Sequence, residues 1–270
     1  MVALSPVEYA RVLPLLEHPL LSLESRSVAR GHSPGWVYVD SAIAPQIALI
    51  WSQGIEGYYL AGDPQAEGIR SLNRFIDAAI APRGLAKGMR SIEISGCSPE
   101  WERPIHNVFA ERDLRVETML IYGQENQDLP ASRPIANASS FHQIDHAFLA
   151  NPPCDDTTLL DSKLALLWED LDTFERLGTG FCIIRDAVLV SVCLTAFTTD
   201  DVHLIDIETL KDYQGNGFAY HVARSYLAHC LHNELTLYWG CMESNTASAK
   251  LAERLGFVKV LTYPLYSFSI

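Results

Sequence analysis

Apolar residues in this chain recur in short runs that end at turn-forming residues, and elsewhere they recur with helical spacing. In the second half, the apolar runs 180–185 and 188–195 flank Asp186-Ala187, a pattern that predicts a β-hairpin. The next apolar run, 202–210, leads through a glycine-containing turn into 219–232, which holds no Gly or Pro. We therefore expect this turn to join a strand to a helix.

The rest of the second half continues in the same way. The pattern predicts helices over 161–177 and 245–255, a strand over 235–241, and a final pair of strands at 258–262 and 265–270. The second half thus reads hairpin, strand, helix, strand, helix, strand.

The first half repeats this order of elements. Its predicted elements are a hairpin of 35–40 and 45–51, strands 57–61, 91–95 and 115–122, and helices 5–18, 69–81 and 100–112. The polar stretch 124–138 carries Pro130 and Pro134 and predicts a linker. We infer a degenerate tandem duplication with halves at 1–125 and 140–270 and a linker at 126–139.

The turn after the run 202–210 reads Gln214-Gly215-Asn216-Gly217-Phe218-Ala219. Its glycines lack a Cβ, so the backbone can turn sharply and approach a ligand closely. The first N–H groups of a helix are unpaired and carry a partial positive charge, which predicts an anion site, most naturally for phosphate. The turn is not a P-loop, because no Lys-Ser or Lys-Thr follows it. It is not a dinucleotide fingerprint, because Tyr220 stands where the third glycine belongs.

Downstream, the predicted strand 235–241 leads to Asn245-x-x-Ser248-x-x-Leu251-Ala252-x-x-x-Gly256-Phe257. Together with Gln214-x-x-Gly217-x-Ala219, this resembles the GNAT superfamily of N-acetyltransferases. The phosphate loop of that superfamily is [RQ]-x-x-G-x-[GA], and its next strand leads to N-x-x-[AS]-x-x-L-x-x-x-x-G-F. The I-E-T, Trp-x-Cys and Asn-x-x-Ser-x-x-Leu-Ala segments further resemble a subgroup that has an extra N-terminal half and includes a zwittermicin-resistance acetyltransferase.

The resemblance implies an α/β (α+β) fold of tandem GNAT-like halves, each with a mixed, mostly antiparallel sheet flanked by helices. It also implies acetyl-coenzyme A (acetyl-CoA) as the cofactor, bound where the strand 202–210 splays from the next strand. The backbone of the strand end is expected to meet the pantetheine, the turn to cradle the pyrophosphate, and the last helix to line the other side. The residues implied in these roles are Ile207, Glu208 and Thr209, then Gln214, Gly215, Asn216, Gly217, Phe218 and Ala219, and finally Asn245 and Ser248.

Acetyl transfer to an amine also needs a group that takes the amine proton. The candidates for this base are Glu208, His203 and Asp206. Strand alternation places His203 on one face and the two carboxylates on the other, so all three face the substrate only if a bulge intervenes. Many relatives place an acidic Tyr seven residues after the Asn, where this chain has Ala252. An acid role is then left to Tyr220, Ser244 or water, or no acid is needed.

The first half has Leu60-Ala61-Gly62-Asp63-Pro64 where a phosphate loop belongs. Pro64 has no N–H, and the Asp63 carboxylate repels phosphate. We therefore expect coenzyme A to bind only to the second half, and we expect the first half to cover it and wall the substrate cleft.

The composition, with 48% hydrophobic and 20% charged residues, is typical of a globular protein with a substantial core. A net charge of −13 argues against nucleic acid or an anionic membrane as a partner and favours a cationic small molecule. No apolar run approaches the length of a membrane span, and no signal peptide is evident. Six cysteines without a C-x-x-C predict buried free thiols and a cytoplasmic location, and the spacing of the nine His residues predicts no metal site.

Three functions stay open from the sequence. The first is acetyl-CoA-dependent N-acetylation of a primary amine on a small polar molecule, by direct attack in a ternary complex. The second is a non-catalytic acyl-CoA-binding or regulatory module that keeps the fold. The third is N-acetylation of a protein or peptide. The acceptor and the oligomeric state are not predicted.

Overall fold

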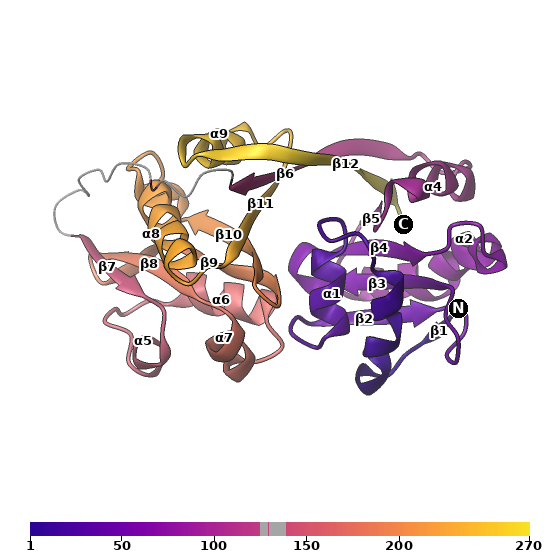
Figure 1. Cartoon of the computed structure of the whole chain (residues 1–270), viewed down its shortest axis with the longest axis horizontal. Helices are drawn as coiled ribbons and strands as arrows, with labels where there is room; N and C mark the ends of the chain where they lie inside the picture. Colours follow the sequence, from indigo (N-terminus) through magenta and orange to yellow (C-terminus); the bar gives the residue numbers. More distant parts are fainter. Residues whose placement is uncertain (125–128, 130–138) are drawn as a thin grey trace. The chain divides into compact units, whose positions relative to one another are not determined.

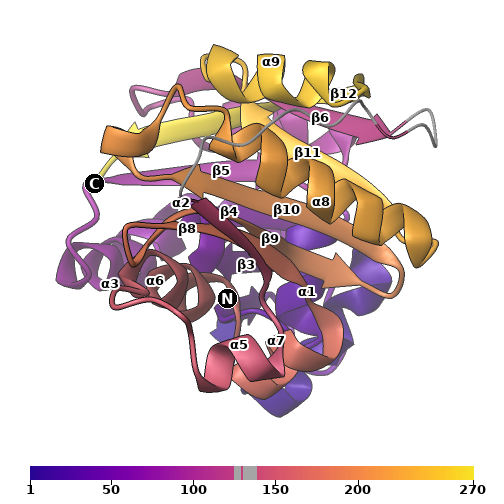
Figure 2. The same cartoon turned by 90° about the vertical axis from the view of Figure 1, so that its left-hand side faces the viewer.

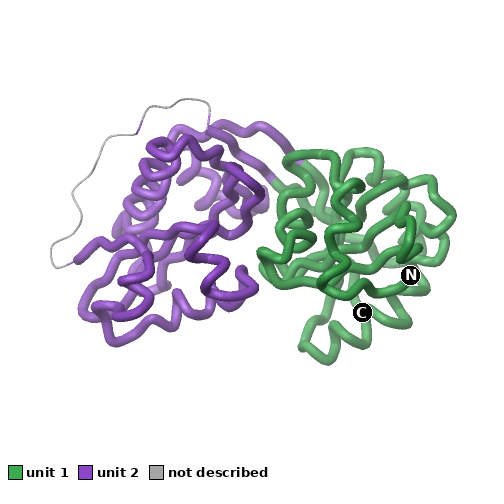
Figure 3. Tube along the Cα trace, turned by 60° about the horizontal axis from the view of Figure 1, so that its bottom comes forward, with its two compact units in different colours: residues 1–119, 263–270 green, residues 120–262 purple. Residues whose placement is uncertain are grey.

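The computed structural model describes residues 1–124, 129 and 139–270 (Figure 1). The chain forms two compact units (Figure 3). The first unit holds Met1–Met119 and Tyr263–Ile270, and the second unit holds Leu120–Thr262. The predicted linker 126–139 lies outside the described residues, apart from Leu129 and Ser139. The predicted boundaries of the halves stay a proposal, and the C-terminal segment packs with the first unit.

The sheet of the first unit contains β1 (Val2–Ala3), β2 (Gly35–Val39), β3 (Ile47–Ser52), β4 (Gly57–Gly62) and β5 (Ser91–Gly96) in that spatial order. Strands β1 to β4 run antiparallel to their neighbours, whereas β4 and β5 run parallel. The end of β12 (Phe257–Ser269) pairs antiparallel with β5, so that Tyr266 lies opposite Ile94. The last strand of the chain therefore completes the sheet of the first unit.

Helical segments cover both faces of this sheet because its strands alternate apolar side chains between two cores. On β3, Leu49 and Trp51 join one core while Ala48 and Ile50 join the other, and all four are buried. The core of Ala48 includes η1 (Pro6–Leu15) and α1 (Leu23–Ala29). The helical segments on the side of Leu49 are η3 (Glu67–Ser71), α2 (Leu72–Phe75), η4 (Ile76–Ile80), α3 (Ala81–Ala86), η5 (Pro99–Trp101) and α4 (Glu102–Val108). The short η2 (Gln53–Ile55) joins β3 to β4.

The sheet of the second unit has the spatial order β6-β11-β10-β9-β8-β7. These strands are β6 (Arg115–Gln124), β7 (Ser139–Gln143), β8 (Gly180–Arg185), β9 (Val188–Thr199), β10 (Val202–Thr209) and β11 (Thr236–Met242). Strands β7 to β10 run antiparallel to their neighbours, whereas β10 and β11 run parallel. Each unit therefore contains a parallel pair of strands, β4 with β5 and β10 with β11, in a mostly antiparallel sheet.

Helices cover both faces of the second sheet as well. Helix α8 (Phe218–His232) packs across β8, β9, β10 and β11 (Figure 2), and its buried Tyr226 and Leu227 enter the core on that face. Helix α6 (Thr158–Leu167) packs on β9 from the other face. The remaining helices are α5 (His146–Ala150), α7 (Leu171–Leu177), η6 (Lys211–Tyr213) and α9 (Thr246–Arg254). Among the described residues, no helix is long and apolar enough to cross a membrane.

The predicted hairpin of 180–185 and 188–195 is confirmed. Its turn residues Asp186 and Ala187 have φ of 52° and 62°, the left-handed pair that a two-residue hairpin turn needs. The repeated order of elements is also confirmed, and it extends to elements that the sequence pattern missed. Strand β1 pairs with β2 at the start of the first unit, just as β7 pairs with β8 in the second.

Two predicted elements are wrong. A single helix over 161–177 does not form, because Trp168 is extended and Asp170 starts a new helix by accepting the N–H of Thr173 at 2.7 Å. The predicted final pair of strands is one continuous strand, β12. Pro264 does not break it, and the Pro264 carbonyl accepts the Ser95 hydroxyl at 3.1 Å.

Candidate active site

Strands β10 and β11 pair over only part of their length. Their ladder runs from Val202 opposite Thr236 to Ile205 opposite Trp239, although β10 continues to Thr209 and β11 to Met242. On its other side β10 stays paired with β9 as far as Thr209. The end of β10 therefore has one backbone edge that β11 does not occupy.

Alternation along β10 shows which groups lie on that edge. The N–H of Leu210 donates to Val190 O on β9 at 2.9 Å, so the N–H groups of Ile207 and Thr209 point to the opposite side. The carbonyl of Thr209 is held there by Gln214, whose Nε2 donates to it at 3.2 Å. The N–H of Ile207 is thus aimed at the open space beside the strand.

The loop between η6 and α8 is open and rich in donors. Gly215 and Gly217 have φ of 78° and 81°, and a Cβ added to either glycine would meet nothing within 4 Å. Among the described residues, the N–H groups of 215–219 have no backbone acceptor, and the first helical bond runs from His221 to Gly217 O. Phe218 is 1% exposed and anchors the start of α8 in the core.

These features fit the pyrophosphate of coenzyme A. The 15-residue helix α8 directs the positive end of its dipole at the loop, and the glycines leave room for a ligand against the backbone. The Asn216 side chain braces the loop from within, because its Nδ2 donates to Tyr213 O at 3.0 Å and to Gln214 O at 3.3 Å. The loop is therefore preformed, and its N–H groups are left for an anion.

The corresponding loop of the first unit lacks these features. Gly62 also has a positive φ, of 90°, but an added Cβ would collide with the Gln46 carbonyl, so this glycine allows a close approach to β3. The Asp63 N–H donates to Gln46 O at 2.9 Å, and the Asp63 carboxylate accepts the Gln65 N–H at 2.8 Å. Pro64 has no N–H. A cavity of about 390 Å³ lies beside this loop, with His18 and Trp101 in its wall, but the loop offers it no row of free donors.

Asn245 and Ser248, which the resemblance assigns to the coenzyme, have partners within the chain. Asn245 caps α9 by accepting the Ser248 N–H at 3.1 Å, and the Trp239 indole donates to the Ser248 hydroxyl at 2.9 Å. Their side chains therefore fix the junction of β11 and α9. Ala252, which stands where many relatives have the acidic Tyr, is fully buried in the core.

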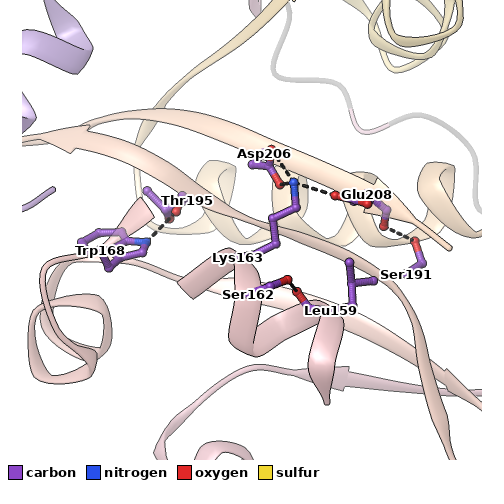
Figure 4. A network of polar contacts seen from close by, with 8 residues as sticks. All are labelled: Leu159, Ser162, Lys163, Trp168, Ser191, Thr195, Asp206 and Glu208. Carbon is purple, nitrogen blue, oxygen red and sulfur yellow. Dashed lines mark hydrogen bonds and ion pairs between the residues drawn. The ribbon is translucent and has the colours of Figure 1, made fainter. Parts of the chain in front are cut away.

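Two acidic side chains near the end of β10 meet one lysine from α6 (Figure 4). Lys163 Nζ lies 3.0 Å from Asp206 Oδ2 and 2.6 Å from Glu208 Oε2. Burial opposes the charge on Lys163, but the two carboxylates together outweigh it and raise the pKa of the ammonium. Burial also disfavours the charged form of Asp206 and raises the pKa of that carboxyl, although the nearby Lys163 lowers it in part. Glu208 keeps 46% of its side chain exposed, so it is the carboxylate of this group that a solute can reach.

His203 lies on the opposite face of β10, against α8. Its Nδ1 is 2.9 Å from the Tyr226 hydroxyl and 3.1 Å from the Thr195 hydroxyl, and only 4% of the residue is exposed. Burial lowers the pKa of His203 to about 4, with a smaller contribution from His229. This imidazole is therefore neutral at pH 7 and is part of a buried polar network.

A bulge is present, but it lies in β9 and leaves the alternation of β10 unchanged. Leu204 pairs with Phe197 and Ile205 pairs with Thr195, so Ala196 has no partner in the register. The indole of Trp168 donates to the Thr195 carbonyl at 2.9 Å. The structure therefore brings Asp206 and Glu208 together and keeps His203 apart from them.

Sequence reasoning missed Lys163, Thr195 and Tyr226. None of them belongs to a motif, and their roles depend on which face of β9 or β10 each helix covers. A lysine inside the apolar helix 158–167 was the one available signal, because a charge on a core-facing position needs a partner.

The cysteines are all free, and five are buried while Cys154 is partly exposed. The prediction of buried free thiols is confirmed for those five. Across residues 1–124 and 139–270, no group of three or more His, Cys, Asp or Glu side chains is arranged to hold a metal ion.

Comparisons with known proteins show the family to which the chain is similar. The sequence profile described as GNAT acetyltransferase matches residues 15–266. YdfB of Bacillus subtilis (strain 168), an uncharacterized N-acetyltransferase, is 25% identical over 234 residues, which cover 86% of this chain and 85% of that protein.

Solved structures share the fold. A GCN5-related N-acetyltransferase-like protein from Streptococcus suis has a TM-score of 0.65 at 21% identity, covering 98% of this chain and 100% of its own. A tandem GNAT protein from the clavulanic acid biosynthesis pathway has a TM-score of 0.61 at 11% identity, covering 99% of this chain and 97% of its own. The predicted fold class is confirmed, and the resemblance to the zwittermicin-resistance subgroup stays a prediction.

The buried state of His203 predicts a pH-dependent stability. Because the pKa of His203 is about 4 in the folded chain and 6.5 when free, unfolding takes up a proton between these values. The contribution of His203 to the free energy of unfolding is therefore fully present above pH 6.5. It falls by on the order of 3 kcal/mol as the pH falls toward 4. Urea unfolding of the wild type and His203→Gln across this range measures it.

The difference in unfolding free energy between wild type and variant is expected to grow as the pH rises from 4 to 6.5. Burial raises the pKa of Glu24 in the first unit to about 7, which gives an opposite trend in both proteins and cancels in the difference. The exposed His106→Gln variant controls for the loss of an imidazole. A difference that does not change with pH would contradict the buried neutral state of His203.

Proposed function

This chain belongs to the GNAT acetyltransferase family and is an acyltransferase, and we propose that it acetylates a primary amine of a small polar molecule from acetyl-CoA. The amine attacks directly in a ternary complex. The observation that carries the proposal is the open glycine loop at the start of α8, which follows a strand with a free edge and an exposed carboxylate at its end.

The loop 214–219 would hold the pyrophosphate through its unpaired N–H groups. The N–H groups of Ile207 and Thr209 would meet the pantetheine arm and the thioester carbonyl along the edge that β11 leaves. Acetyl-CoA supplies an acetyl group already activated as a thioester. Asn245 and Ser248 would line the other side of the coenzyme, while the Asn245 Oδ1 and the Ser248 hydroxyl also hold the junction of β11 and α9.

Glu208 is the proposed base. It lies on β10 beyond the last residue paired with β11, and its carboxylate is half exposed, so an acceptor amine can approach it. His203 has neither property, because it is buried on the face covered by α8 and its Nδ1 is engaged. We therefore prefer Glu208 to His203, although both were candidates from the sequence.

No general acid is assigned. The position seven residues after Asn245 is Ala252, which is buried in the core. A thiolate is a good leaving group and needs little help from an acid. An amine arrives as an ammonium at neutral pH and must lose a proton, so the need for a base is greater.

The proposed acceptor carries a positive charge before it reacts. The chain has a net charge of −13, and the reactive end of the site presents an exposed Glu208. A peptide N-terminus also meets this description and is the second candidate. A screen of coenzyme A thiol release across simple amines, aminoglycosides and peptides separates the two, and turnover with peptides alone would favour the second.

Coenzyme A is expected to lose affinity for Gly217→Glu by roughly 10-fold or more, because the new carboxylate enters the anion cradle and repels the pyrophosphate. Isothermal titration calorimetry measures the change. Gly88→Glu is the matched control, since Gly88 also has a positive φ, of 85°, and open space around it, but lies in the first unit. Equal affinity of both variants and the wild type would refute the assignment of the loop.

Turnover is expected to fall roughly 10²-fold or more in Glu208→Gln, the usual scale for losing a general base. Coenzyme A affinity should stay near the wild-type value, because the variant keeps the backbone that grips the pantetheine. The defect should shrink as the pH rises, since more of the acceptor is then already neutral. Steady-state thiol release with an acceptor from the screen measures both effects, and wild-type turnover of Glu208→Gln would exclude it as the base.

A further inference from the structure

Lys163 lies beside the proposed base and belongs to neither sequence motif. It projects from α6 toward β10, and its ammonium contacts Asp206 and Glu208, which lie two residues apart on the same face of that strand (Figure 4). The lysine side chain is only 16% exposed. It therefore approaches the reactive end of the site from the helix side and not from solvent.

The ammonium does not bind its two partners in the same way. It donates a hydrogen bond to Asp206 Oδ1 at 3.3 Å and lies 3.0 Å from Asp206 Oδ2, which has no hydrogen-bond partner among the described residues. Of Glu208, only Oε2 lies within ion-pair distance, at 2.6 Å. In the described part of the chain, Glu208 Oε1 has no hydrogen-bond partner. One oxygen of the proposed base is thus fixed, while the other keeps its lone pairs for a proton.

Lys163 is itself unsuited to react. Its pKa is raised once the two carboxylates outweigh the effect of burial, so it stays an ammonium with no lone pair to attack or to accept a proton. Lys163 can therefore influence the reaction only through the two carboxylates that it binds.

We propose that Lys163 is a positioning residue for acetyl transfer: anchored by Asp206, it fixes Oε2 of Glu208 so that Oε1 faces the acceptor amine. This rests on the proposed role of Glu208 as the base. An exposed glutamate otherwise samples several rotamers, of which few direct a lone pair at the substrate. The contact with Lys163 restricts that choice before the acceptor arrives.

The arrangement is also consistent with the charges during the reaction. The acceptor ammonium first gives one proton to Glu208 Oε1. The neutral nitrogen then forms a bond to the acetyl carbon while the bond from that carbon to sulfur breaks, and the leaving thiolate takes the second nitrogen proton. Glu208 is then neutral, and Lys163 keeps Asp206 as its counter-charge. The ammonium is therefore never left without an anionic partner in its partly buried position.

The test is a double-mutant cycle with Lys163→Met and Glu208→Gln, measured by steady-state thiol release. Lys163→Met is expected to lower kcat by about 10-fold or more, on the scale of a misplaced catalytic group, while the KM for acetyl-CoA stays unchanged. In the Glu208→Gln background the same change is expected to cost nothing further, because Lys163 has no base left to position. Lys259→Met, which removes an exposed lysine from β12, is the matched control and should match the wild type.

Three outcomes would overturn the proposal. The first is wild-type kcat for Lys163→Met, and the second is a loss from Lys163→Met that is equally large with and without Glu208, which would indicate a structural brace only. The third is wild-type turnover of Glu208→Gln, which would show that Glu208 is not the base. This failure of the proposed function is distinguished from the others because the single variant Glu208→Gln reveals it. If Lys163→Met alone does not fold, the charge-balanced pair Lys163→Met with Asp206→Asn takes its place in the same cycle.

Discussion

The pairing of β10 is the constraint on which the rest of the site depends. Backbone bonds to β9 fix which side chains of β10 face α8 and which face α6, while the early end of the β11 ladder leaves its other edge open. One strand thereby serves three purposes. It buries His203 in a polar network, presents Glu208 to solvent, and offers backbone N–H groups to a ligand. A slip of one residue would exchange the first two, because the side-chain period of a strand is two.

The two units show what separates the proposed coenzyme loop from an ordinary turn. In each unit the first strand of the parallel pair leads into a turn that contains a glycine with positive φ. In the first unit the N–H of Asp63 donates to the Gln46 carbonyl, that of Ala66 to the Asp63 carbonyl, and that of Gln65 to the Asp63 carboxylate. The glycine of this turn packs against the start of β3. In the second unit, Gly215 and Gly217 have no neighbour to pack against, and their donors stay unpaired among the described residues.

Much of this could be predicted from local sequence, because the information is itself local. The hairpin at Asp186-Ala187, the glycine loop and the cap of α9 at Asn245 each depend on a few adjacent residues. The break between α6 and α7 had one local signal, the cap at Asp170, but the extended Trp168 also depends on the distant Thr195 carbonyl. The continuity of β12 through Pro264 could not be predicted, since it depends on Ser95, far along the chain. The same applies to Lys163, whose role follows from the register of β10 and the position of α6 and from no motif of its own.

The central claim is that one loop, 214–219, binds coenzyme A while its counterpart around Asp63 does not. Amide hydrogen exchange of the full chain, with and without coenzyme A, tests this directly because it reports the N–H groups concerned. The account predicts slower exchange over 207–219 and unchanged exchange over 60–66 when the coenzyme is added. Protection over 60–66, or unchanged exchange over 207–219 at saturating coenzyme A, would contradict it.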